Sequence, residues 1–398
     1  MVKKVLIAIV LFLIAVVTII FIYRYQLFQF SAETIIRKAL PEYIKIDRIY
    51  FDFKESKIVL GGFKITNPPN FSYKDLLEIE EVSCKYKMRG KTFMDGIEIY
   101  EGLFKKPVIV IERLRDARLN LVEMQHVMGK GPQAAAKTGQ GRGDRPKSAN
   151  MLGSKKLSDI VKLPNEFSLK EGKIMYVDRL GLAKPHMITI ENIDAVLALK
   201  LNDSYSSVLE VGSSGQGDLN GDSNEIVRWF ITYNPTTPKL TMSNRFEVSN
   251  LDIISFEPYY DRHSPLIFVK GKFSGSLIFD FDNGNIGSTN EIHLSDFRFY
   301  IKQGYETAQF WGTTVPDLVR YFSSPSGDIV FDFKIKGDMD NPKFYLGPIS
   351  KQALTSMAID KISSAIQKAS SPEGGGPKSD IEKAKEYIDL FKGLINKK

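Results

Sequence analysis

The sequence predicts a mainly β protein with an N-terminal transmembrane helix, an elongated antiparallel curled sheet (a trough or a sandwich) and short terminal helices. Three observations predict this fold class: one long apolar run near the N-terminus, many short runs in which apolar and polar residues alternate, and turn-forming residues between those runs. Helical patterns do not alternate regularly with the strand patterns, which favours antiparallel over parallel pairing.

The first element is an uncharged apolar run from Val5 to Ile22. At about 1.5 Å per residue, a helix of this length nearly matches the hydrocarbon thickness of a bilayer, so the chain can span a membrane once. Lys3 and Lys4 precede the run, and the positive-inside rule therefore places the N-terminus in the cytoplasm. A cleavable signal peptide is the alternative, but bulky residues follow the run where small residues would mark a cleavage site.

The period-two alternation is the signal for strands with one apolar and one polar face. It is clearest in residues 329–335, where Ile, Phe, Phe and Ile alternate with Val, Asp and Lys, and it is also clear in residues 49–53 and 193–201. Further candidate strands and the turns between them follow. The strands are at 58–65, 108–111, 187–190, 277–281 and 297–301, and the turns include 67–70 and 282–284.

Composition and periodicity divide the chain into five segments. Residues 129–156 lack aromatics and are rich in Gly, Ala, Lys and Arg, so we expect a flexible linker there. The C-terminal segment is apolar at helical spacing, and its helices either cap the end of a sheet or form a basic amphipathic surface for a membrane or partner. The segments are a cytoplasmic tip and anchor at 1–30, an N-terminal β region that opens with a short helix at 31–128, the linker at 129–156, a β-rich trough region at 157–349 and a helical tail at 350–398.

The composition argues against several functional classes. Cys84 is the only cysteine, which excludes an internal disulfide and a cysteine-based metal cluster. The net charge of +7 is modest and spread along the chain, which suits a position near an anionic membrane better than nucleic-acid binding. We therefore expect membrane lipids as partners and no nucleic acid.

A search for catalytic motifs finds none. No two of the four histidines have metal-ligand spacing, and each is expected in a turn or at the surface; they are His126, His186, His263 and His293. Four aspartates could in principle pair across a cleft, but they are expected to be solvated on polar strand faces; they are Asp52, Asp280, Asp282 and Asp332. We predict no catalytic residues, no metal, no cofactor and no enzymatic activity.

Several segments resemble the AsmA-like family of bacterial inner-membrane-anchored envelope proteins. After an N-terminal anchor and a short helix, the chain reads IDRIYFDF at 46–53, KIVLGGFKITNP at 57–68 and NFS at 70–72, in the order found at the start of that family. The likeness continues at 95–99, 106–112 and 119–121, and later at 169–178 and 336–344. It covers most of the chain outside the linker and the tail.

The resemblance implies an inner-membrane protein with a cytoplasmic N-terminus, a periplasmic body and a β-sheet groove. Such a protein would act in lipid transport during cell envelope biogenesis and outer membrane assembly, and its partners would include other envelope proteins. A one-sided sheet must cover its apolar face or fill it with something apolar, such as acyl chains. The candidate groove residues are Ile49, Phe51, Phe53, Leu197, Leu199, Leu277, Phe279, Phe281, Phe331 and Phe333.

Alternation alone does not distinguish an open groove from a closed sandwich core. Two functions therefore stay open beside lipid transfer. One is a non-enzymatic structural or adaptor protein of an envelope complex. The other is an anchored hydrolase, which would require a convergent acid or histidine cluster in a pocket.

Overall fold

A computed structural model describes most of the body of the chain. It covers residues 33–34, 37, 40–90, 95–129, 161–182, 184–202, 208–261, 264–306, 309–310, 313–324 and 326–369. The expected anchor, linker and last part of the tail, together with most of the expected helix at 31–40, lie outside the described residues. Within the described residues, no helix has the length and apolar character needed to cross a membrane.

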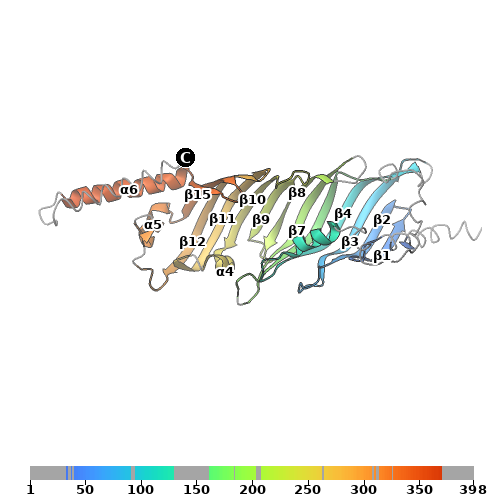
Figure 1. Cartoon of the computed structure of the whole chain (residues 1–398), viewed down its shortest axis with the longest axis horizontal. Helices are drawn as coiled ribbons and strands as arrows, with labels where there is room; N and C mark the ends of the chain where they lie inside the picture. Colours follow the sequence, from blue (N-terminus) through green and yellow to red (C-terminus); the bar gives the residue numbers. More distant parts are fainter. Residues whose placement is uncertain are drawn as a thin grey trace, which may run out of the picture. The chain divides into compact units, whose positions relative to one another are not determined.

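The fold is mainly β, as predicted (Figure 1). The described strands form one large, open and mostly antiparallel sheet of fourteen strands, accompanied by a two-stranded hairpin and a few short helices. The chain divides into two compact units: unit 1 contains the described residues up to Met187, and unit 2 contains those from Ile188 onward. We describe each unit by itself.

From residue 40 onward, the described part of unit 1 contains six strands and the helix α2. Its first four strands pair antiparallel in chain order. Two later strands, β5 and β6, pair with β4 in parallel, so the antiparallel expectation is wrong here. Parallel neighbours need a long crossover, which residues 114–165 supply. The elements are β1 (Ile44–Asp52), β2 (Lys57–Thr66), β3 (Asp75–Met88), β4 (Ile97–Arg113), α2 (Asn120–Gly129), β5 (Val161–Lys162) and β6 (Glu166–Asp178).

Unit 2 is a run of strands in which each is antiparallel to the next. The strands are β7 (His186–Leu201), β8 (Val208–Leu219), β9 (Ile226–Tyr233), β10 (Met242–Asp252), β11 (Leu266–Asp282), β12 (Asn285–Ile301), β15 (Ile329–Asp338) and β16 (Lys343–Leu346). The remaining elements are η4 (Ile253–Phe256), α4 (Glu257–Tyr260), the hairpin β13 (Gln309–Phe310) and β14 (Thr313–Thr314), α5 (Val315–Phe322) and α6 (Pro348–Ala369).

The turn between β11 and β12 confirms one sequence prediction in detail. Asp282 pairs with Asn285, and the two residues between them, Asn283 and Gly284, have φ values of 45° and 87°. Asn-Gly with two positive φ values is the preferred two-residue hairpin turn, because its twist matches that of the strands. The expected strands at 277–281 and 297–301 are parts of the two long strands on either side of this turn.

Several long strands contain an internal bulge that the alternation did not predict. Asn192 has a φ of 50° inside β7, which joins the two runs expected at 187–190 and 193–201 into one strand. In β10, Asn250 has a φ of 57°, and the register with β11 shifts between Val248 and Leu251. A bulge places two consecutive residues on one face, so the alternation of the strand changes phase there.

The outer edge of β1 is occupied by one side chain. The guanidinium group of Arg37 donates hydrogen bonds to the carbonyl oxygen of Ile46 and, at 2.7 Å, to that of Asp47. It also pairs with Glu33 at 2.8 Å. Because β1 is the first strand in the sheet order, these bonds satisfy carbonyl groups that have no neighbouring strand.

A buried polar network ties the end of β4 to the loops around it. The Glu112 carboxylate is fully buried and accepts hydrogen bonds from Arg179 Nε at 2.8 Å and from the Ser72 amide at 2.7 Å. Asn120, also fully buried, accepts from the Glu112 amide and donates to Asn67 and to a β4 carbonyl. Burial opposes the charged form of Glu112, but the hydrogen bonds from Arg179 and Ser72 outweigh it and lower the pKa of this carboxyl.

The alternation predicted a solvated Asp332, but the structure buries this residue. It is 9% exposed, and its carboxylate accepts hydrogen bonds from the Ile349 amide at 3.2 Å and the Ser350 amide at 2.7 Å. These two amides belong to the first turn of α6, where amide groups have no partner within the helix. Asp332 therefore fixes the start of α6 against β15, a long-range role that a strand pattern does not reveal.

Candidate functional site

The strands of unit 2 share one apolar face, which is the strongest candidate for a functional site. Cross-strand register defines it: Leu277 lies opposite Phe246 and Asn290, and Phe279 lies opposite Asn244 and Ser288. We call this surface the apolar face of unit 2. Its apolar members on the central and final strands include Leu197, Leu199, Val211, Trp229, Ile231, Tyr233, Met242, Phe246, Leu277, Phe279, Phe281, Ile286, Ile292, Phe331, Phe333 and Ile335.

The alternate positions of the same strands form a polar face. Ser243 donates to Asp280 at 2.6 Å across β10 and β11, and Arg245 pairs with Glu247 at 2.8 Å. Asp332 and Glu291 lie opposite each other on β15 and β12. The sheet of unit 2 therefore has one apolar face and one polar face, as the period-two pattern predicts.

Most apolar side chains of this face are half-buried, although Trp229 is buried. Leu197, Leu199 and the groove candidates on β11 and β15 all keep intermediate exposure. Among the described elements, β8, β9 and β12 make extensive contacts only with neighbouring strands, while β10 and β11 also contact η4. Figure 1 shows β8 to β12 side by side, with α4 at one end of them. Within unit 2, the helical elements come close to the sheet at β10, β11 and β15.

Short helices cover the apolar face at two places. Phe256 of η4 packs on a buried cluster that contains Val248 and Leu251, and the ring of Tyr260 contacts the ring of Phe268 at 5.4 Å between centroids. At the last strands, Phe322 of α5 lies 5.7 Å from Phe331. Leu354 and Met357 of α6 pack against Phe322 and Leu346. These contacts leave β8 and β9, and the portions of β10 to β12 that carry Phe246, Leu277 and Phe279, without a helix.

Aromatic rings line the face at the last two strands. Phe333 lies 5.8 Å from Phe331 and 5.2 Å from Phe344, measured between ring centroids. Phe344 is 55% exposed although it stands within this group. Sequence reasoning missed Phe344, because the run at 343–346 is too short to show alternation.

The structure places the ten predicted groove residues in two groups. Seven of them, Leu197, Leu199, Leu277, Phe279, Phe281, Phe331 and Phe333, lie on the apolar face of unit 2. The other three belong to unit 1, where Ile49 and Phe51 are 2% and 8% exposed and Phe53 is half-buried against Phe51. They pack with Leu40 and residues of β2 in one cluster, so they offer little surface to a ligand.

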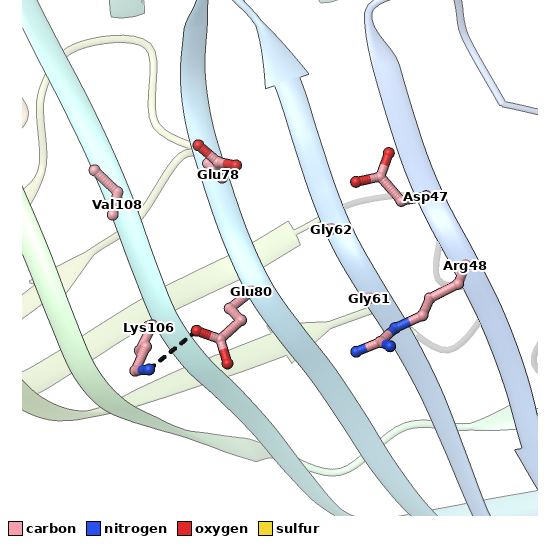
Figure 2. Close-up of a pocket in the computed structure, with 8 residues that line it drawn as sticks. All are labelled: Asp47, Arg48, Gly61, Gly62, Glu78, Glu80, Lys106 and Val108. Carbon is pink, nitrogen blue, oxygen red and sulfur yellow. Dashed lines mark ion pairs between the residues drawn. The ribbon is translucent and has the colours of Figure 1, made fainter.

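Unit 1 has a hollow on its polar face (Figure 2). Gly61 and Gly62 form its floor, because a side chain at Gly61 would collide with Arg48 and one at Gly62 with Asp47. The acids that line it are Asp47, Glu78 and Glu80. Glu78 pairs with Lys64 at 2.7 Å, and Glu80 pairs with Lys106 at 3.1 Å. Two of the three acids of this hollow are therefore paired with lysines of the protein.

The titratable groups show little that points to catalysis. His293 is exposed and lies 2.7 Å from Glu291, and His263 falls outside the described residues. Cys84 is half-buried, and burial raises the pKa of its thiol, which disfavours the reactive thiolate. Within the ranges that the structure describes, no group of three acids, histidines or cysteines could hold a metal ion.

Comparison of the chain with models of known protein families and with curated proteins gives no match. The function is therefore inferred from the geometry of the apolar face.

Proposed function

We propose that the protein is a membrane-anchored lipid-binding or lipid-transfer protein that holds acyl chains on the apolar face of unit 2. The observation that carries the proposal is the extent of that face: half-buried Leu, Ile, Phe, Tyr and Met side chains continue from β7 to β16, and the helical elements of unit 2 approach these strands at β10, β11 and β15. Soluble proteins rarely leave a continuous apolar surface open, and such surfaces mark sites of ligand, protein or membrane contact.

Acyl chains suit the chemistry of this face. Each methylene that leaves water for an apolar surface contributes about 0.8 kcal/mol, so one chain gains several kcal/mol from lying along the face. The register of unit 2 keeps the charged residues on the opposite side of each strand, with Arg245 and Asp280 as examples. The mechanism is passive: the acyl chains lie on the apolar face, and the lipid headgroups stay at its solvent-exposed edge.

The proposed location is the inner membrane, with the N-terminus in the cytoplasm and the bulk of the chain in the periplasm. The uncharged run from Val5 to Ile22 supports the anchor, because it is long enough to span a bilayer once. The position of the anchor near the first strand would keep the sheet close to its own membrane and to the lipids of the outer leaflet.

Site-specific photocrosslinking in the full-length protein tests the proposal. A benzoylphenylalanine is placed at Phe279, on the apolar face, and in a second protein at Phe230. Phe230 is a matched control because it is 53% exposed on the neighbouring sheet region but belongs to the polar face, opposite Arg245. After irradiation of cells that express each protein, the crosslinked adducts are identified by mass spectrometry.

We expect phospholipid adducts at Phe279 and none above background at Phe230. A second pair of variants, Phe279→Lys and Phe230→Lys, should separate in the same way when lipids that co-purify with each protein are counted. Equal adducts at the two positions, or none at Phe279, would overturn the proposal. A protein adduct at Phe279 in place of a lipid would favour the structural or adaptor function instead.

A further inference from the structure

Asn244 is an exception to the chemistry of the apolar face. It stands on β10 between Ile231 of β9 and Phe279 of β11, at a position where an apolar residue would continue the pattern of Met242 and Phe246. It is 5% exposed. Its side-chain oxygen, Oδ1, is buried and has no hydrogen-bond partner. An unpaired buried amide oxygen of this kind costs free energy, so its retention requires an explanation.

A second asparagine on the same face shows what a structural role requires. Asn290 is 1% exposed and lies opposite Leu277 and Phe333. Its Oδ1 accepts a hydrogen bond from the Ile278 amide at 3.1 Å, and its Nδ2 donates to Ser288 Oγ at 2.9 Å. Asn290 thereby links β12 to the backbone of β11 and to its own neighbour Ser288. Asn244 makes no such bond through Oδ1, so the fold does not account for its carbonyl oxygen.

We propose that Asn244 is a selectivity residue of the apolar face, and that its Oδ1 accepts a hydrogen bond from a hydroxyl or amide N–H group carried on, or next to, the acyl chain of the ligand. An amide oxygen is only an acceptor, so a plain hydrocarbon tail cannot satisfy it. A hydroxylated or amide-linked acyl chain supplies the donor while its methylenes contact Ile231 and Phe279. This inference rests on the lipid-binding function proposed above and names the class of lipid.

Three probes distinguish the two proposals: palmitic, 2-hydroxypalmitic and 3-hydroxypalmitic acid. The full-length protein is kept in a fluorinated surfactant, whose tails mix poorly with acyl chains, and each acid displaces the fluorescent fatty acid cis-parinaric acid. The chain has two tryptophans, of which Trp229 lies on the apolar face next to Phe246. In a Trp311→Phe background, energy transfer from Trp229 to cis-parinaric acid reports binding at this face.

We expect one hydroxylated probe to bind about fivefold more tightly than palmitic acid, the ratio that one net hydrogen bond supplies. In Asn244→Leu the preference should disappear, through weaker binding of the hydroxylated probe and unchanged binding of palmitic acid. Asn244→Ala should behave in the same way. Asn244→Leu should not lower the urea midpoint, whereas Asn290→Leu should lower it, because Asn244 Oδ1 has no partner to lose.

Equal binding of all three probes to the unaltered protein, or a preference that survives Asn244→Leu, would overturn the role of Asn244 and leave the lipid-binding proposal standing. Failure of every probe, including cis-parinaric acid, to bind would overturn both proposals together.

Discussion

The apolar residues of β1 in unit 1 and those of β11 in unit 2 come from the same sequence pattern but reach different environments. Ile49 and Phe51 are buried under Leu40 and the side chains of β2. Leu277 and Phe279 are half-buried, in a part of the face that no described helix covers. Alternation therefore predicts which side of a strand is apolar. Whether that side is buried depends on the elements from other parts of the chain that pack against it.

The largest expected difference between the two regions is in stability. Phe51→Ala should lower the free energy of unfolding by about 3–5 kcal/mol, because it leaves a cavity in a closed cluster. Phe279→Ala should cost about 1 kcal/mol, since less contact and less buried area are lost on a partly open face. Urea unfolding of the two variants measures both values. Equal losses would mean that the apolar face of unit 2 is as closed as the cluster of unit 1.

Glu112→Ala should destabilise the protein by about 3 kcal/mol, because it leaves Arg179 and the Ser72 amide without their buried partner. Glu101→Ala is the matched control in the same strand, since Glu101 makes an exposed ion pair with Lys85 at 2.9 Å. The control should leave the urea midpoint unchanged. A similar loss in both variants would contradict the importance of burial in this network.

The same network predicts a dependence on pH. The folded-state pKa of Glu112 is lowered, so its contribution to stability is fully present above the unfolded-state value of about 4.3 and is lost as the pH falls through the folded-state pKa. The difference in unfolding free energy between the unaltered protein and Glu112→Gln should therefore shrink from pH 7 toward pH 3. Chemical denaturation at several pH values measures it, and a constant difference would exclude this linkage.

The smallest expected effect concerns the single cysteine. Burial raises the pKa of the Cys84 thiol, so maleimide should label the folded protein several-fold more slowly at pH 7.5 than it labels the protein in urea. Cys84 lies on the apolar side of β3, opposite Ile58 and Gly102. Equal labelling rates would indicate that this part of unit 1 is as accessible as an unfolded chain.

Much of the architecture could be predicted from the sequence, because a strand needs only local alternation and a tight turn needs only Asn-Gly. The run at 329–335 and the turn at Asn283 and Gly284 are examples. The parallel pairing of β4 with β6 could not, since it depends on a crossover rather than on either strand. Asp332 shows the same limit: its sequence neighbours indicate a polar strand face, but the start of α6 buries it.

The candidate site was only partly predictable for a related reason. Seven of the ten groove candidates share one face, because alternation assigns side chains to faces correctly wherever the strand is regular. Across a bulge, alternation no longer assigns side chains to the correct face. At Asn192, for example, two expected runs form one strand in which the alternation changes phase. The orphan amide of Asn244 has no sequence signal at all, since its significance lies in the hydrogen bond that it does not make.

The position of Arg37 has a consequence for association between copies of the chain. An unprotected first strand can recruit the edge of another sheet, which leads to open-ended polymers. Arg37 occupies the carbonyl groups of Ile46 and Asp47, so a strand that docked there would first have to displace a charged side chain. Arg37 therefore blocks the pairing of a further strand with the edge of β1, and the large sheet does not extend into a second copy of the chain at this edge.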